Sequence, residues 1–122
     1  MRPIQDGRVR IDGVQITPHV LYPTDIFARA FTEAPFDISE LSASSYILQL
    51  AQGECAYQAI PVFVSRAFRH GGFYVRSDSG IETPKDLEGR LVGVPEYQMT
   101  MALWARGLLQ DEYGVDFRTL KY

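Results

Sequence analysis

The chain has 122 residues, of which 46% are hydrophobic and 12% aromatic. These values are typical of a globular domain with a buried core and exclude a disordered chain. The 12 basic and 15 acidic residues leave a net charge of −3. We expect no nucleic-acid partner, because nucleic-acid-binding domains usually carry a basic surplus. The single cysteine excludes an internal disulfide.

The first residues and the longest apolar runs bear on location. Met1 and Arg2 are followed by mainly polar residues, without the apolar centre of a secretion signal. No run approaches the roughly 20 apolar residues that a membrane span needs. The sequence therefore predicts a cytoplasmic protein without membrane contact.

The first 35 residues predict one strand and one helix. Val14 and Ile16 alternate with polar residues, which predicts a strand over residues 14–22. Thr24 is expected to cap a helix that ends near Thr32. Apolar residues recur in this helix at helical spacing, and we expect them to face the core: Ile26, Phe27, Ala30 and Phe31.

A serine-rich turn follows a short predicted strand at residues 36–39. We expect a helix from about Tyr46 to Gln52, ended by Gly53. Serine hydroxyls at a helix start cap backbone N–H groups, and that role alone explains their presence. Together with free N–H groups they would also suit a ligand carboxylate. Both interpretations are open for Ser42, Ser44 and Ser45.

Residues 56–64 and 72–76 predict two further strands. The connection between them carries the one compact basic cluster of the chain, formed by Arg66, Arg69 and His70. Arginine binds carboxylates through two parallel hydrogen bonds, and histidine can exchange a proton near neutral pH. The alternative is a solvated connection whose arginines form surface ion pairs.

The stretch Thr83–Thr100 reads T-P-K-D-L-E-G-R-L-V-G-V-P-E-Y-Q-M-T. It predicts a short helix capped by Thr83, with Pro84 in the first helical position and Asp86 near the positive helix end. Gly89 is expected to take the left-handed conformation that ends such a helix.

A buried strand over residues 91–94 and a long helix from about Tyr97 to Tyr113 are expected next. Asp116 is expected to start a short turn, and Leu120 the next strand. Four residues of the long helix are spaced to form its buried face: Ala102, Leu103, Leu109 and Tyr113.

Because strands alternate with helices, the sequence predicts an α/β fold with parallel strand pairs. Ligands of open α/β sheets bind beyond the carboxyl ends of the strands. Three segments occupy that position here: Glu40–Ser45, Ser65–His70 and Pro95–Thr100. We expect them to form one anion-binding crevice.

The chain has none of the motifs that mark nucleotide-phosphate sites, dinucleotide sites, zinc proteases or serine hydrolases. A lone cysteine offers no metal-ligand spacing. We therefore expect neither a metal nor a cofactor.

Three segments resemble the 4,5-dihydroxyphthalate decarboxylase family, whose members share the fold of type 2 periplasmic binding proteins. They read FDISELSASSYI at residues 36–47, AIPVFVSRAFRH at residues 59–70, and GVPEYQMT with GLLQDEYGV at residues 93–115. The resemblance implies most of a first lobe over residues 1–89, without its first strand. It implies only the beginning of a second lobe over residues 90–122, because family members are far longer.

The resemblance implies cofactor-independent decarboxylation of an aromatic dihydroxy dicarboxylate. It places His70 as the acid or proton shuttle, with Glu96 and Tyr97 as further catalytic groups. Glu96 is equally explained by its favourable position at a helix start. The expected substrate-binding residues are Ser42, Ser44, Ser45, Arg66, Arg69, Gln98, Met99 and Thr100.

Two other interpretations are open. The same crevice would suit the solute-binding protein of an ABC-type transporter, which grips a small anion without turnover. The chain would alternatively be an inactive truncated fragment. Sheet edges left by a missing strand would favour pairing with a second copy, so a homo-oligomer is also expected.

Overall fold

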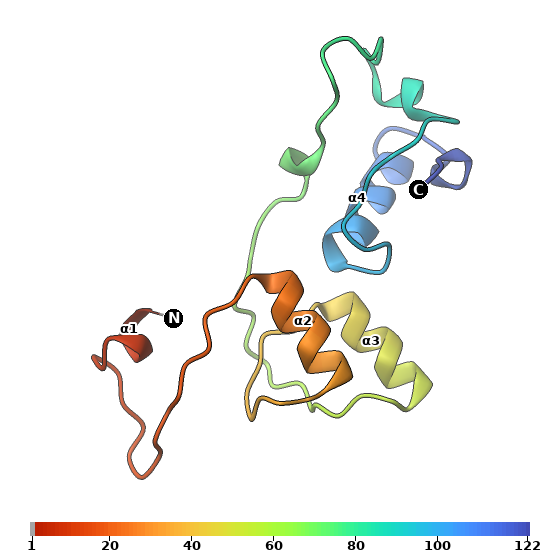
Figure 1. The fold of residues 1–122 in the computed structure, drawn as a ribbon. Coiled ribbons are helices and arrows are strands. Elements are labelled where there is room, and N and C mark those ends of the chain that lie inside the picture. Colours follow the sequence, from red (N-terminus) through yellow and green to blue (C-terminus); the bar gives the residue numbers. More distant parts are fainter. Residues whose placement is uncertain (1) are drawn as a thin grey trace.

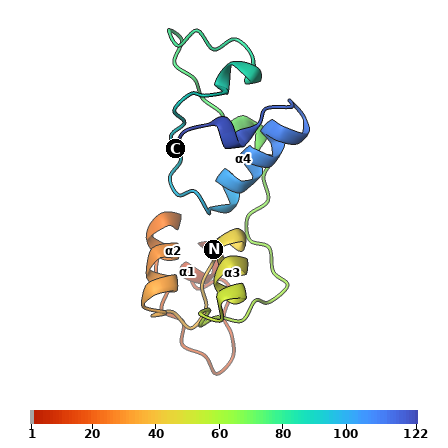
Figure 2. The ribbon, with the colours of Figure 1, turned by 90° about the vertical axis from the view of Figure 1, so that its right-hand side faces the viewer.

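The computed structural model describes residues 2–122 as helices joined by extended chain (Figure 1). α2 and α3 lie side by side in one group, and α4 lies with the C-terminal residues in another (Figures 1 and 2). A long connecting segment, residues 53–83, runs between the two groups. The elements within residues 2–122 are α1 (Arg2–Gln5), α2 (Pro23–Thr32), α3 (Ala43–Gln52), η1 (His70–Gly72), η2 (Pro84–Leu87), α4 (Thr100–Asp111) and η3 (Phe117–Thr119).

The predicted α/β fold of the type 2 periplasmic-binding-protein kind is wrong, because residues 2–122 form no sheet. Their strand pairing is limited to one parallel bridge between Leu91 and Lys121. In it, the Val92 N–H donates to the Lys121 carbonyl at 2.7 Å. The other predicted strands form no ladder, and most of their residues are extended chain. A helix satisfies its own backbone groups, whereas a strand needs a neighbour alongside, and these segments have none.

α2 confirms the first predicted helix and its inner face. It begins at Pro23, a residue suited to the first helical position, and Tyr22 rather than Thr24 is the N-cap. Phe27 and Ala30 are buried. The other two residues predicted to face inwards, Ile26 and Phe31, are half-buried.

α3 confirms the second predicted helix, although it begins at Ala43, three residues earlier than expected, with Ser42 as its N-cap. Its predicted end is correct: Gly53 takes a left-handed conformation with φ of 76°. The Gly53 N–H donates to the Leu50 carbonyl at 3.1 Å. A residue without Cβ adopts this conformation at little cost.

α4 is shorter than predicted at both ends, and its buried face is only partly as expected. Ala102 and Leu109 are buried, but Leu103 and Tyr113 are exposed, so their assignment to that face is wrong. Leu109 forms the main apolar cluster with Val115 and Leu120. Three partly buried residues pack against this cluster: Leu87, Val92 and Phe117.

The predicted division at residues 89/90 stays a prediction. Leu87 and Val92 lie on either side of it and pack against the same apolar cluster. η2 precedes the division and begins as predicted, since Pro84 is its first residue. The Thr83 N–H donates to the Asp86 carboxylate at 2.8 Å, which closes a capping box.

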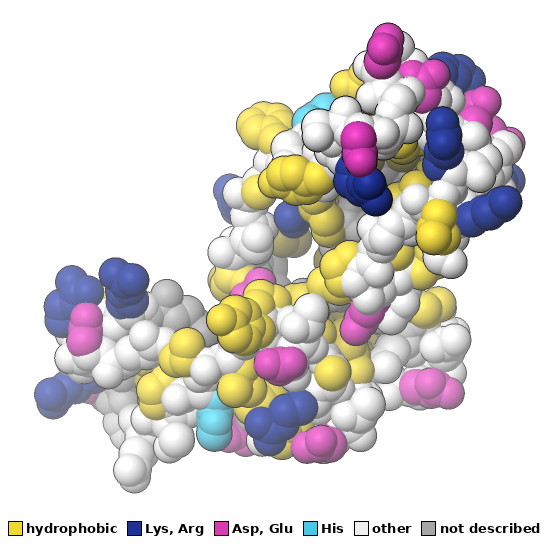
Figure 3. Space-filling model, turned by 45° about the horizontal axis from the view of Figure 1, so that its top comes forward, with side chains coloured by type: hydrophobic (Ala, Val, Ile, Leu, Met, Phe, Trp, Pro, Cys, Tyr) yellow, Lys and Arg dark blue, Asp and Glu magenta, His cyan; other side chains and the backbone are white. Residues whose placement is uncertain are grey.

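The connecting segment is strongly exposed although much of it is apolar. Ile60 is 66% exposed, Phe63 73% and Phe68 95%. Figure 3 shows hydrophobic side chains over much of the visible face, while Lys and Arg side chains are spread rather than gathered in one patch. Within residues 2–122, no helix combines the length and apolarity needed to cross a membrane.

Candidate functional site

The N-termini of α3 and α4 meet, and each helix caps the other. The Thr100 hydroxyl accepts from the Ser44 N–H at 3.1 Å, in the first turn of α3. The Ser42 hydroxyl accepts from the Thr100 N–H at 3.2 Å, at the start of α4. Neither helix is capped by the side chain of its own N-cap residue. Hydroxyls 58 residues apart thus satisfy N–H groups that the helices leave open.

Four side-chain hydroxyls and one backbone carbonyl form a connected network of hydrogen bonds. We call the residues of this network the helix junction: Ser42, Ser44, Ser45, Gln98 and Thr100. The Ser42 and Thr100 hydroxyls lie 3.1 Å apart, and the Ser45 hydroxyl donates to that of Ser42 at 3.3 Å. The Ser44 hydroxyl donates to the Gln98 carbonyl. Ser42 and Ser45 are both buried.

The helix junction brings two positive helix ends to one place. Each helix N-terminus carries roughly half an elementary positive charge, which favours an anion nearby. The structure therefore brings together predicted binding residues from two separate segments, at a position whose positive potential favours an anion. The same hydroxyls cap the helices, as the first interpretation of the serines expects, and their binding of a ligand carboxylate stays a prediction.

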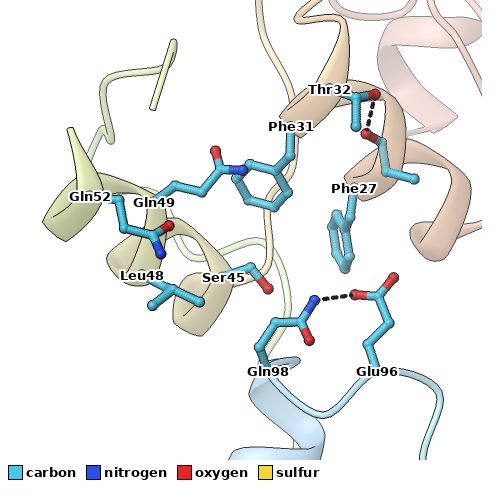
Figure 4. A pocket seen from close by; sticks show the side chains of 10 residues that line it. Phe27, Phe31, Thr32, Ser45, Leu48, Gln49, Gln52, Glu96 and Gln98 are labelled. Carbon is cyan, nitrogen blue, oxygen red and sulfur yellow. Dashed lines mark hydrogen bonds between the residues drawn. The ribbon is translucent and has the colours of Figure 1, made fainter. Parts of the chain in front are cut away.

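A pocket of about 390 Å³ opens beside the helix junction (Figure 4). Phe27 and Phe31 of α2 form one wall, and Ser45 and Gln49 of α3 face them. Such a mixture of aromatic walls and few polar groups is typical of a small-molecule site, and the volume lies in the usual range. The full lining is Phe27, Ala28, Phe31, Thr32, Ser45, Leu48, Gln49, Gln52, Glu96 and Gln98.

Glu96 and Gln98 form the floor of the pocket in Figure 4. The Gln98 side-chain amide donates to the Glu96 carboxylate at 3.2 Å. Glu96 is half-buried and is the one charged side chain in the pocket lining. It can exchange a proton with a bound molecule, whereas Gln98 can donate and accept hydrogen bonds.

His70 does not join the helix junction. Its Nε2 lies 3.0 Å from a Glu112 carboxylate oxygen, just beyond the C-terminus of α4, and both side chains are about half exposed. Thr100 lies at the opposite end of this helix, roughly 18 Å away along its axis at 1.5 Å per residue. Glu112 orients the ring, a role that was not predicted from the sequence.

Arg69 and Arg66 occupy different surroundings. Arg69 is half-buried, and its Nη1 lies 4.0 Å from the Met101 sulfur in the first turn of α4. Because Met101 directly follows Thr100, Arg69 lies beside the start of α4. Arg66 is exposed and lines a separate open hollow of about 300 Å³ with Ala67 and Phe68.

Met99 and Tyr97 flank the start of α4. Met99 is the half-buried N-cap residue of that helix. Tyr97 lies between the pocket residues Glu96 and Gln98 in the sequence. Its ring stacks on Arg106, whose guanidinium carbon is 3.7 Å from the ring centroid. Arg106 was not predicted as a site residue, although its spacing from Ala102 and Leu109 places it on the buried face of α4.

Within residues 2–122, no three His, Cys, Asp or Glu side chains come together as a metal site.

The aromatic wall of the pocket was not predicted from the sequence, because Phe27 and Phe31 were assigned only to packing. Their helical spacing shows that they share a face, but nothing local shows that α3 leaves a gap beside that face.

No family model matches the chain. It is similar to two curated proteins that are both named 4,5-dihydroxyphthalate decarboxylase. The protein from Comamonas testosteroni is 54% identical over 115 residues, which are 94% of this chain and 35% of the relative. The protein from Pseudomonas putida is 50% identical over 115 residues, which are 94% of this chain and 45% of the relative. The predicted resemblance over part of the family's length is confirmed, and the chain spans less than half of either relative.

Proposed function

We propose that this chain contributes to the substrate site of a decarboxylase acting on 4,5-dihydroxyphthalate or a closely similar aromatic dicarboxylate. The name shared by two relatives at 54% and 50% identity supports this substrate class. The observation that carries the proposal is the helix junction with its adjoining pocket. It offers two positive helix ends for a carboxylate and an aromatic wall for a ring.

The proposed binding mode follows from the pocket walls. The ring lies against Phe27 and Phe31, where offset or edge-on aromatic contact is favourable. The retained carboxylate lies toward the helix junction, with Arg69 beside the start of α4 as its charged partner. Further contacts are proposed for the remaining predicted binding residues: Ser42, Ser44, Ser45, Arg66, Gln98, Met99 and Thr100.

The proposed reaction needs one proton at the carbon that bears the leaving carboxylate. A base removes the proton of the hydroxyl para to that carbon, and the electron pair passes through the ring. An acid protonates the carbon, which forms a ketone tautomer. The carbon–carbon bond then breaks, carbon dioxide leaves, and the bonding electrons restore the aromatic ring. The product is the dihydroxy mono-acid, and the phenolic proton returns to its oxygen.

Glu96 is the proton-transfer group that the pocket itself supplies, so we assign it the exchange at the ring carbon. Tyr97 is adjacent and is proposed to assist through its phenol. His70, oriented by Glu112, is the alternative acid. It would have to act from the far end of α4, so the two candidates make different demands on the bound geometry.

A proton NMR time course with the purified chain tests the proposal. The two ring protons of 4,5-dihydroxyphthalate are equivalent, whereas the mono-acid product gives three distinct signals. We expect those three signals to appear faster than in a heat-denatured control. Glu96→Gln should slow their appearance at least 100-fold, as expected for loss of a general acid or base. If Glu96 is the acid, His70→Ala should slow product formation less than Glu96→Gln does. If His70 is the acid, His70→Ala should slow it more.

The same spectra distinguish a binding protein from an enzyme. Unchanged substrate whose signals broaden in the presence of the chain would support the solute-binding alternative. Unchanged, sharp signals would contradict both functions for this chain. The predicted absence of a metal and of a cofactor stays a prediction, which turnover after treatment with a chelator and exhaustive dialysis would test.

We further propose a cytoplasmic location, a small aromatic carboxylate as partner, and no nucleic-acid or membrane partner. Cell fractionation tests the location. The exposed apolar residues of the connecting segment support a homo-oligomer, because contiguous exposed apolar surface favours association. Light scattering coupled to size-exclusion chromatography tests the oligomeric state.

A further inference from the structure

Arg106 is a charged side chain on the buried face of α4. It is only 7% exposed, between Ala102 at 4% and Leu109 at 5%, which lie one turn on either side of it. Arginine is almost never this buried unless its charge is paired. The position of Arg106 therefore calls for a partner.

The contacts of Arg106 do not supply a negative charge. Its Nη1 donates to the Tyr97 carbonyl at 2.8 Å, and its guanidinium lies over the Tyr97 ring. Tyr122 meets that ring edge-on, with centroids 4.9 Å apart. Among residues 2–122, no Asp or Glu oxygen lies within 4.0 Å of the guanidinium. A carbonyl and a ring face satisfy part of the group and leave its charge uncompensated.

Most of the hydrogen-bonding capacity of Arg106 is unused. A guanidinium has five N–H donors, and one hydrogen bond to the chain is made here. Every fully enclosed side-chain nitrogen or oxygen in the part of the chain that the structure describes has a partner. The other guanidinium nitrogens, which have none, therefore reach solvent. A mostly buried cation thus keeps donors that no group of the described residues uses and that are not sealed from solvent.

We propose that Arg106 binds the carboxylate of an aromatic acid, with Tyr97 and Tyr122 beside the ring of that acid. The planar fork of arginine matches a carboxylate through two parallel hydrogen bonds. The two tyrosine rings give an aromatic ligand more contact than an aliphatic one. Burial raises the pKa of the Tyr122 phenol, so this ring stays neutral and does not compensate the charge of Arg106.

The site is linked to the pocket through the chain at residues 96–98. Glu96 and Gln98 line that pocket, and Tyr97 between them contacts Arg106. An aromatic diacid is the ligand that the proposed function would supply, and only this identification of the ligand rests on that function. The carboxylate chemistry of the site rests on Arg106 itself.

NMR of the full 122-residue chain, labelled with ¹⁵N in its arginine side chains, tests this inference. Phthalate is the probe, and the Nε–Hε signal of Arg106 is the readout. We expect a saturable downfield shift of that proton, since a carboxylate would accept from it. Benzoate should act similarly, and cyclohexanecarboxylate at least fivefold more weakly. A shift confined to Arg66 or Arg69, or an equal response to chloride, would overturn the proposal.

Two variants give an independent measurement. Arg106→Lys should weaken phthalate binding at least tenfold, because lysine cannot make the bidentate contact. Arg118→Lys is the matched control: Arg118 also stacks on a ring, that of Phe117, but is exposed and paired with Asp116. It should leave binding unchanged. If Arg106→Lys fails to fold, the titration of the unsubstituted chain still decides.

This experiment separates the two proposals. A saturable Arg106 shift in a chain that leaves 4,5-dihydroxyphthalate intact would remove turnover from this chain and retain the carboxylate site. Turnover without any Arg106 response would retain the decarboxylase and overturn the site.

Discussion

The helix junction forms a network of tertiary hydrogen bonds, whereas the connecting segment leaves most of its apolar side chains exposed. At the helix junction, α3 and α4 satisfy their own backbone groups and use hydroxyls to satisfy what remains. In the connecting segment, Ile60, Val62 and Phe63 are mostly exposed, and the chain is extended. The contrast teaches that apolar, strand-forming sequence does not make a sheet without a second strand alongside.

The largest expected difference compares a buried leucine with an exposed valine. Leu109→Ala removes part of the cluster that contains Val115, so it should lower the free energy of unfolding by roughly 2–5 kcal/mol. Val62→Ala in the connecting segment should change it by less than about 0.5 kcal/mol, because Val62 is exposed. Urea unfolding followed by far-UV circular dichroism measures both. A similar loss for both variants would mean that the connecting segment is packed in solution.

The next expected effect concerns the hydroxyl that joins the two helices. Thr100→Val keeps the shape of the side chain but removes the acceptor for the Ser44 N–H. Thr100 is half-buried, and loss of a cap typically costs about 1 kcal/mol. Thr32→Val, which removes a hydroxyl bonded to the Ala28 carbonyl at an exposed site, is the control.

Equal unfolding free energies for the Thr100 and Thr32 variants would contradict a stabilising role for the helix junction. Backbone amide exchange provides a second reading. Thr100→Val should speed exchange of the Ser44 N–H, whereas Thr32→Val should leave that rate unchanged.

A smaller effect is expected where the connecting segment touches α4. A Cβ at Gly72 would clash with the Met101 methyl carbon, whereas a Cβ at Gly71 would meet nothing within 4 Å. Gly72→Ala should therefore destabilise the chain by about 1 kcal/mol, limited by the flexibility of methionine. Gly71→Ala should be close to neutral. Urea unfolding compares the pair, and indistinguishable variants would show that η1 does not dock on α4.

The smallest effect is a pH dependence at the capping box of η2. Hydrogen bonds from the Thr83 and Glu82 N–H groups, with the Thr83 hydroxyl, hold the pKa of Asp86 below its usual value. A lowered pKa in the folded chain means that this contribution to stability is present above the unfolded pKa, about 3.9. It is lost as the pH falls through the lower folded value.

Carbon-13 NMR titration of the Asp86 carboxyl group measures this difference directly. The midpoint in the folded chain should lie below the midpoint in the same chain unfolded in urea. Coincident midpoints would show that the capping box does not form in solution. Thr83→Ala should bring the two midpoints closer, because it removes the hydroxyl that donates to Asp86.

The sequence by itself predicted α2, α3, η2 and α4, and it predicted some of their ends, such as Gly53 after α3 and Thr83 before η2. Gly53 and the Thr83–Asp86 pair act within one turn of the chain, so their effect can be predicted from neighbouring residues. It also placed serines and a threonine at two helix starts. The residue types at the candidate site were therefore predictable, but not their partners, because each helix start is capped by a hydroxyl of the other.

Only the tertiary structure decided which of these helix starts meet and which extended segments lack a partner. Ser42 and Thr100 are 58 residues apart, and His70 pairs with Glu112, 42 residues away. The proposed carboxylate site at Arg106 forms only in the tertiary structure, which places the Tyr97 ring against its guanidinium and the Tyr122 ring against that of Tyr97. The physical reason is range: a helix closes its hydrogen bonds within four residues, whereas sheets, pockets and charge pairs depend on contacts between distant parts of the chain.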